Sequence, residues 1–174
     1  MMSDGLELVA RGVSVQFEGL KALSNVTLTV PRGRIAGLIG PNGAGKTTLI
    51  NVLTGFQPVG TGTVVLEGET LNGIAAHMLR RKGVARTFQS GRLFRDLPVV
   101  DNLEVTGVGL GQSRPDAIGE AERVMAWLGI SHLANTIAGA LPYTDERRVA
   151  IGRAIVREPK VFLFDEPLSN LDAE

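Results

Sequence analysis

Nine consecutive residues have the types and spacing that would let them cradle a phosphate group. They are Gly40, Pro41, Asn42, Gly43, Ala44, Gly45, Lys46, Thr47 and Thr48, and they fit the pattern G-x-x-x-x-G-K-S/T. Glycines let the backbone curl so that successive N–H groups face phosphate oxygens, and a following helix adds the positive end of its dipole. We expect Lys46 to reach the β- and γ-phosphates and the Thr47 hydroxyl to bind Mg²⁺. The alternative is a glycine-rich turn with a solvated lysine.

A pair of acidic residues, Asp165 and Glu166, follows the four apolar residues 161–164. An apolar strand that ends in acids is the complement of a phosphate loop in a nucleotide hydrolase. We expect Asp165 to hold Mg²⁺ and Glu166 to orient or deprotonate the attacking water. In isolation, the same two acids could simply solvate a strand-to-turn junction.

The loop needs a strand before it and a helix after it. The apolar run 35–39 predicts a buried parallel strand, and residues 47–53 predict a short helix that Gly55 ends. Residues 161–164 predict a second strand, and residues 84–88 a third, with Gln89 at its C-terminal end, where open α/β sheets bind ligands.

The other elements follow from alternation, turn residues and helix stop signals. Strands are predicted at 13–17, 26–30 and 63–66, and helices at 74–82, 116–128 and 144–157. Strand signals fade between residues 97 and 157, which predicts a helical subdomain.

Composition restricts the class of protein. The 174 residues suit one domain, and 18 Lys and Arg balance 18 Asp and Glu, so no strong field favours nucleic acid or anionic lipid. The absence of cysteine excludes disulfides and fits a reducing compartment. The N-terminus has no basic signal region, and no apolar run approaches the length of a membrane span. We interpret the chain as cytoplasmic, with any membrane association made through a partner.

The order of the phosphate loop, Gln89, Asp165-Glu166 and the segment 169–172 resembles the ATP-binding subunits of ABC transporters. Residues 83–89, followed by Arg92-Leu93-Phe94, are most similar to the branched-chain amino acid transport subfamily. The resemblance implies an α/β fold: a P-loop NTPase core with a mainly parallel sheet, N-terminal antiparallel strands and an inserted helical subdomain. Residues 1–174 would then be one nucleotide-binding domain, with the core in 1–96 and 158–174 and the helical part in 97–157.

The resemblance also implies roles for single residues, with ATP and Mg²⁺ as cofactors. Phe17 would stack on adenine, although it could be an ordinary strand aromatic. Gln89 would contact the nucleotide and Mg²⁺ and link them to the membrane subunit; otherwise it caps local backbone. Asp172 would touch the opposite monomer. The catalytic set would then be Glu166, Lys46 and Gln89, and the metal set Thr47, Gln89 and Asp165.

In this family two ATP-binding subunits dimerise head to tail, each closing a signature motif over the other's ATP, and they drive integral membrane permease subunits. The segment 141–145 stands where that signature is expected, before a helix whose arginines suggest a solvated face. Pro142 replaces a serine, Thr144 replaces a glycine, and Asp145 adds a carboxylate. Each change is expected to weaken ATP binding in trans, and the Thr144 hydroxyl to compensate in part.

The family pattern continues beyond Asp172 into another strand and a histidine, whereas this sequence stops at Glu174. His77 and His132 precede the acidic pair, so neither takes that role, and both are expected on the surface of helices. We interpret the chain as a shortened domain that lacks the C-terminal strands, which predicts exposed apolar surface and marginal stability.

Three hypotheses follow from the motifs and their departures. The leading one is an ATPase that energises import of branched-chain amino acids or a related small solute. The second is a regulatory or partner-dependent nucleotide-binding module with little ATPase activity of its own. The third is one half of an asymmetric heterodimer, and soluble ABC ATPases of repair or translation are a lesser alternative, disfavoured by the neutral charge and the lack of long heptad repeats.

Overall fold

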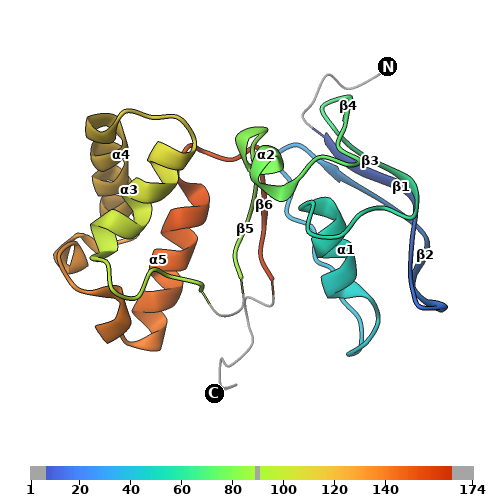
Figure 1. Ribbon diagram of the computed structural model, residues 1–174, viewed down its shortest axis with the longest axis horizontal. Coiled ribbons are helices and arrows are strands. Elements are labelled where there is room, and N and C mark those ends of the chain that lie inside the picture. The colour runs from blue at the N-terminus through green and yellow to red at the C-terminus, as the bar shows by residue number, and fades with distance from the viewer. Residues whose placement is uncertain (1–6, 89–90, 166–174) are drawn as a thin grey trace. The chain divides into compact units, whose positions relative to one another are not determined.

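The structure is a computed structural model that describes residues 7–88 and 91–165. It contains two compact units, Met1–Lys82 and Gly83–Glu174, which are described one at a time (Figure 1). The predicted division into a core and a helical subdomain at residues 97–157 stays a prediction.

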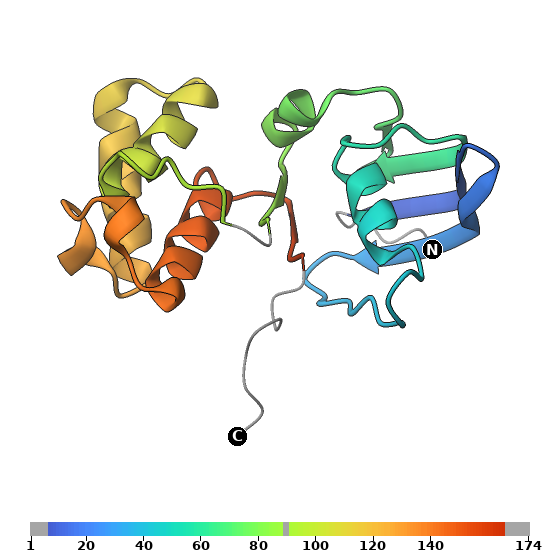
Figure 2. The same cartoon turned by 60° about the horizontal axis from the view of Figure 1, so that its bottom comes forward.

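The first unit is built on an antiparallel sheet with the strand order β2-β1-β3-β4 (Figure 2). The strands are β1 (Glu7–Phe17), β2 (Leu20–Pro31), β3 (Thr61–Leu66) and β4 (Glu69–Thr70). β1 lies in the middle, so Leu8 faces Val30 of β2 on one side and Leu66 of β3 on the other. The three strands predicted in this region are confirmed, but the two-residue β4 was not predicted.

The described part of the first unit, residues 7–82, also contains two helices, and both were predicted. α1 (Lys46–Leu53) buries Leu49, Val52 and Leu53, and Gly55 follows it with a φ of 74°. A left-handed glycine directly after a helix is a common way for it to end. α2 (Ala76–Arg81) buries Leu79 and has Arg80 and Arg81 in its last turn, where positive charge is favourable. His77 is exposed on α2, as expected.

The strand predicted at residues 35–39 is wrong. These residues have no regular secondary structure, and Ile35 and Ile39 are 103% and 95% exposed. An apolar run can become a parallel strand only when neighbouring strands satisfy its backbone on both sides. Among the described residues no strand pairs with this run.

In its described residues, the second unit combines a parallel strand pair with three helices. β5 (Val84–Arg86) pairs in parallel with β6 (Val161–Leu163). The helices are α3 (Val99–Gly109), α4 (Arg114–Trp127) and α5 (Tyr143–Ile155), with the 3₁₀ turns η1 (Ser131–Leu133) and η2 (Ala138–Ala140) between α4 and α5. The strands near 84 and 161 and the helices near 116 and 144 are confirmed, while α3 was covered only by the expectation of a helical region.

The core of the second unit lies among the three helices. Its buried members are Val99, Leu103, Ala121, Met125, Ile130, Val149 and Val156. α4 begins where the Ser113 side chain accepts a hydrogen bond from the Asp116 N–H, an N-cap that Pro115 reinforces. His132 is exposed in η1. Within the described ranges, no helix has the length and apolar character needed to cross a membrane.

Candidate nucleotide-binding site

The predicted phosphate loop leads directly into α1, and its backbone has the conformation that the glycines permit. Gly43 and Gly45 have φ values of 79° and 82°, in the left-handed region that favours glycine. The Ala44 N–H donates to the Pro41 carbonyl at 3.2 Å, which closes a turn inside the loop. A Cβ on Gly45 would lie 2.5 Å from the Ala22 carbonyl oxygen, so the loop packs closely against β2. The loop is therefore held at the start of the helix by backbone packing.

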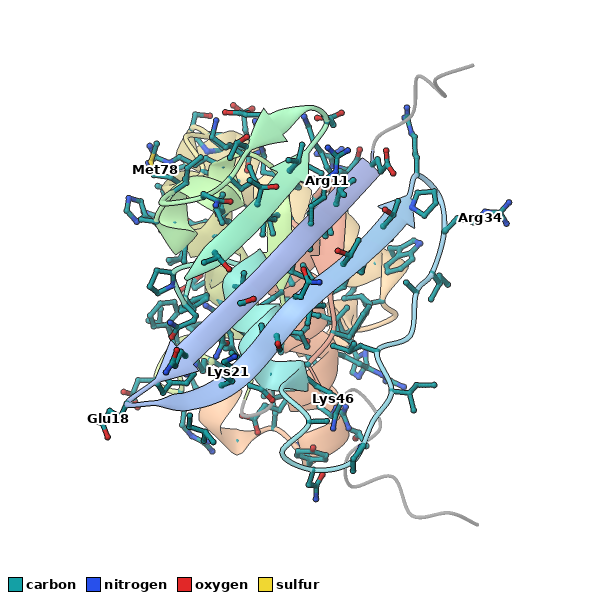
Figure 3. All side chains as sticks on the ribbon, turned by 90° about the vertical axis from the view of Figure 1, so that its right-hand side faces the viewer. Arg11, Glu18, Lys21, Arg34, Lys46 and Met78 are labelled. Atoms are coloured by element: carbon teal, nitrogen blue, oxygen red, sulfur yellow. The ribbon has the colours of Figure 1, made fainter. Side chains whose placement is uncertain are left out.

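Lys46 is the first residue of α1 and folds back over the loop (Figure 3). Its Nζ donates to the carbonyl oxygens of Gly40 and Pro41, both at 2.8 Å. The ammonium group has three N–H donors, so this arrangement uses two of them on the loop itself. The first turn of α1 carries no acidic residue. The cation and the positive helix end therefore face no local carboxylate from that turn, which suits an anionic ligand.

Two further residues predicted to contact the nucleotide or its Mg²⁺, Thr47 and Phe17, belong to the same unit. Thr47 is exposed in the first turn of α1, where its hydroxyl is accessible. Phe17 ends β1 and is 43% exposed, so it is not a core aromatic. An exposed ring at a strand end is available for stacking on a base, and the adenine role of Phe17 stays a prediction.

Asp165 follows β6 in the second unit and makes hydrogen bonds with Arg86, the last residue of β5, and with Thr87, the residue after it. Its Oδ2 accepts a hydrogen bond from Arg86 Nη2 at 2.6 Å, and the Asp165 N–H donates to Thr87 Oγ1 at 3.4 Å. The side chains of Arg86 and Asp165 are 6% and 11% exposed. Sequence reasoning missed Arg86, although a charged residue inside an apolar strand is a signal that a buried partner is required.

Several predicted residues lie outside the described residues, namely Gln89, Glu166 and Asp172. Of the predicted Mg²⁺ ligands, Thr47 offers a hydroxyl oxygen and Asp165 offers carboxylate oxygens, which are the donor types that Mg²⁺ prefers. Over residues 7–88 and 91–165 there is no cluster of three or more acidic or histidine side chains that could hold a metal by itself. Taken one at a time, Thr47 and Asp165 therefore have donor chemistry that suits Mg²⁺.

The altered signature segment 141–145 lies at the beginning of α5. Pro142 is the N-cap residue, with φ −59° and ψ 153°, and a proline suits the entry to a helix because the N–H it lacks would have no helical partner. Asp145 and Glu146 occupy the first turn, where their charge is favourable for the helix. Asp145 also pairs with Arg148 at 3.4 Å. Pro142 and Asp145 therefore suit the start of the helix, whereas the cap expected from the Thr144 hydroxyl is absent, because Pro142 is the N-cap and no side chain caps α5.

The arginines of α5 do not form a uniform solvated face as expected. Arg153 is partly buried, and desolvation lowers the pKa of its guanidinium group. Its Nη1 donates to the Arg92 carbonyl at 2.5 Å, and its guanidinium lies 5.0 Å from the centre of the Phe94 ring. Arg153 thus ties α5 to the segment that follows Gln89 in the chain.

Asn102 of α3 also bonds to this segment, and sequence reasoning missed it too. It is fully buried, its Oδ1 accepts from the Phe94 N–H at 2.9 Å, and its Nδ2 donates to the carbonyls of Phe94, Leu97 and Pro98. One buried side chain therefore bonds to four backbone groups of a single turn. No sequence pattern distinguishes this asparagine from a solvated one.

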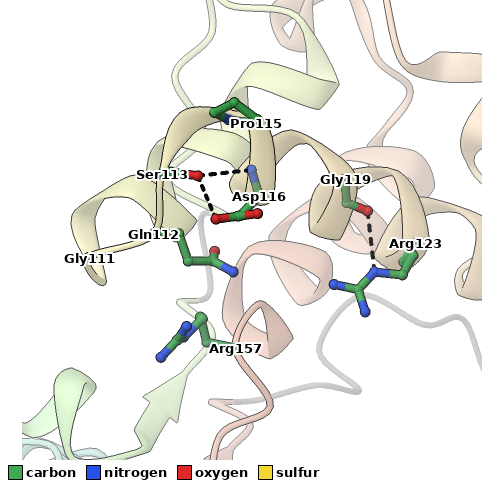
Figure 4. A pocket seen from close by; sticks show the side chains of 8 residues that line it. All are labelled: Gly111, Gln112, Ser113, Pro115, Asp116, Gly119, Arg123 and Arg157. Atoms are coloured by element: carbon green, nitrogen blue, oxygen red, sulfur yellow. Dashed lines mark hydrogen bonds between the residues drawn. The ribbon is translucent and has the colours of Figure 1, made fainter.

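A separate polar hollow of about 570 Å³ lies at the N-terminal end of α4 (Figure 4). It is lined by Gly111, Gln112, Ser113, Pro115, Asp116, Gly119, Arg123 and Arg157. Two of its lining residues take part in local structure, through the Ser113 cap and the bond from Arg123 Nε to the Gly119 carbonyl. None of the predicted site residues lines this hollow.

Comparisons with known proteins agree with the motifs. Residues 23–169 match the family described as ABC transporter. The chain is 39% identical to the high-affinity branched-chain amino acid transport ATP-binding proteins LivG of Salmonella typhimurium and BraF of Pseudomonas aeruginosa, over 95% of this chain and 71% of each relative.

Solved structures lead to the same family. The ADP conformation of an ATP-binding cassette from an ABC transporter has a TM-score of 0.86 and 30% identity, covering 96% of this chain and 71% of that one. A nucleotide-free cassette has a TM-score of 0.85 and 30% identity, covering 95% and 71%. The predicted α/β cassette fold is confirmed, and the chain belongs to the ABC transporter family as one of its ATP-binding cassettes.

Proposed function

We propose that this chain binds and hydrolyses ATP to energise an importer of branched-chain amino acids or a related small solute. The observation that carries the proposal is the loop in which Lys46 braces the carbonyls of Gly40 and Pro41 at the start of α1. The names of the relatives LivG and BraF support the class of solute. The same relatives are transport ATP-binding proteins, so the regulatory-module alternative is not favoured.

In the proposed site the loop amides of residues 40–48 and Lys46 bind the phosphates. When ATP enters, Lys46 exchanges its two loop carbonyls for phosphate oxygens, which are stronger acceptors because they are charged. Thr47, Asp165 and Gln89 would hold Mg²⁺, which supplies charge neutralisation at the phosphates. Glu166 would orient the water for in-line attack, and Phe17 would stack on the adenine ring.

The proposed partners are a second ATP-binding subunit and integral membrane permease subunits, which would hold the chain at the cytoplasmic face of the plasma membrane. Pro142 and Thr144 stand in the signature segment, where relatives of this family close over the partner's ATP. Because Pro142 lacks both a hydroxyl and an N–H to donate to a phosphate and Thr144 adds a Cβ where a glycine is expected, we favour a heterodimer in which the partner supplies an intact signature.

Equilibrium dialysis with ATP tests the phosphate loop through Lys46→Ala. Two charge-assisted hydrogen bonds of about 1.5–3 kcal/mol each imply a loss of affinity on the order of a hundredfold or more. Lys82→Ala is the matched control, because Lys82 pairs with Glu69 on the surface of the same unit. Equal affinity in the parent and Lys46→Ala would refute the assignment of the loop.

A further inference from the structure

The buried ion pair between Arg86 and Asp165 has no place in the chemistry described so far. Arg86 ends β5 and aligns with Leu163 of β6, and Asp165 lies two residues beyond Leu163. The parallel pairing therefore brings a cation on one strand to the carboxylate at the end of the other. We propose that Arg86 is the counter-ion of Asp165 when no metal is bound. Mg²⁺ must then displace Arg86, or weaken its ion pair with Asp165, before the metal can bind that carboxylate. The inference rests on the proposed function of Asp165 as a metal ligand.

The burial of the pair is the first part of the argument. With side chains 6% and 11% exposed, neither charge is well solvated, and the ion pair offsets part of the cost of burying both. Arg86 thereby holds the Asp165 carboxylate in place at the end of β6. The Asp165 N–H, held by Thr87 Oγ1, fixes the backbone on the same side.

Competition with a metal follows from the geometry of the pair. The guanidinium lies within 2.6 Å of Oδ2, and a divalent cation on the same carboxylate would meet its positive charge at short range. Mg²⁺ also requires a regular shell of oxygen ligands that a guanidinium in contact with the carboxylate obstructs. Arg86 should therefore lower the affinity of Asp165 for metal.

Phe88 gives Arg86 a second favourable contact. The Arg86 guanidinium lies 4.7 Å from the centre of the Phe88 ring, and that of Arg92 lies 4.2 Å from it. The attraction between a cation and an aromatic face would persist when the carboxylate turns to a metal. Arg86 is thus a positioning residue that contacts both the Phe88 ring and Asp165, and its bond to Asp165 is the contact that metal binding changes.

The test is Mn²⁺ binding, measured by electron paramagnetic resonance on the full chain, without nucleotide and with a non-hydrolysable ATP analogue. Arg86→Met is expected to bind Mn²⁺ on the order of tenfold more tightly than the parent, because the competing charge is gone. Arg86→Lys should restore parent-like binding. Arg114→Met is the matched control, since Arg114 makes its ion pair with Glu104, at 2.7 Å, and not with Asp165. Unchanged or weaker Mn²⁺ binding by Arg86→Met would overturn the proposal.

A second measurement covers the case in which Arg86→Met does not fold. In ¹⁵N-arginine-labelled parent protein, the guanidinium signal of Arg86, identified by its loss in Arg86→Lys, should shift or broaden when Mg²⁺ and ATP are added. A signal that does not change under saturating Mg²⁺ and ATP would overturn the proposal. A parent chain that bound no ATP would contradict the proposed function instead, and Mn²⁺ binding without nucleotide would still decide the role of Arg86.

Discussion

Replacing Gly45 by alanine tests whether the phosphate loop is anchored to β2. In the structure the new Cβ would lie 2.5 Å from the Ala22 carbonyl oxygen and 2.9 Å from Leu23 Cδ2. The residue would also keep a φ of 82°, which is unfavourable for any side chain. Gly45→Ala should therefore destabilise the protein through both backbone strain and overlap.

Gly43→Ala separates these two effects. Gly43 has almost the same φ, 79°, but a Cβ added to it would have no atom within 4 Å. Backbone strain of about 1–2 kcal/mol is common to both variants. Overlap with a backbone carbonyl adds about 1–3 kcal/mol to Gly45→Ala alone. For a chain of this size, a difference near 2 kcal/mol corresponds to melting temperatures about 4–8 °C apart.

The assay is urea and thermal unfolding followed by circular dichroism, with dialysis against ATP on the same samples. Gly45→Ala is expected to unfold at lower urea than Gly43→Ala and to lose more ATP affinity, because the loop must move away from β2. Equal unfolding midpoints for the two variants would refute the close packing of the loop on the Ala22 carbonyl, and with it the account of how α1 is positioned.

Three further outcomes are expected. Asn102→Leu should lower the free energy of unfolding by about 2–4 kcal/mol in urea titrations, because the Phe94 N–H loses its side-chain acceptor and the carbonyls of Phe94, Leu97 and Pro98 lose a side-chain donor; a loss below about 0.5 kcal/mol would contradict this. Glu166→Gln should preserve ATP binding but slow phosphate release by about 10²–10⁴-fold, and release at the parent rate would remove Glu166 from the key role. Pro142→Ser combined with Thr144→Gly should raise hydrolysis by the chain paired with itself, and no gain would argue against a weakened signature.

Much of the site could be predicted because its determinants are local. The spacing of Gly40, Gly45 and Lys46 specifies a loop that turns into a helix, and the structure has α1 beginning at Lys46. The strands β1 and β2 and the helices α4 and α5 follow from alternation and from stop signals close to the helix ends. The family followed from the order of such motifs, and the comparisons confirm it.

The errors concern residues whose state depends on distant partners. The apolar run 35–39 was predicted as a buried strand because hydrophobicity indicates that a segment can be buried, not which strand pairs with it. Arg86 and Asn102 were missed for the related reason that a polar residue in a sequence does not reveal which buried groups it satisfies.

The amino-acid sequence by itself determined the phosphate loop, the helix behind it and the family, since these depend on residue types a few positions apart. Only the tertiary structure decided that Gly45 packs on the Ala22 carbonyl, that Lys46 rests on its own loop, and that Arg86 holds Asp165. Arg86 and Asp165 are far apart in the chain and become neighbours only through the parallel pairing of β5 and β6. Pairing of this kind depends on hydrogen bonds between the backbones of segments far apart in the chain, and no local sequence pattern encodes it.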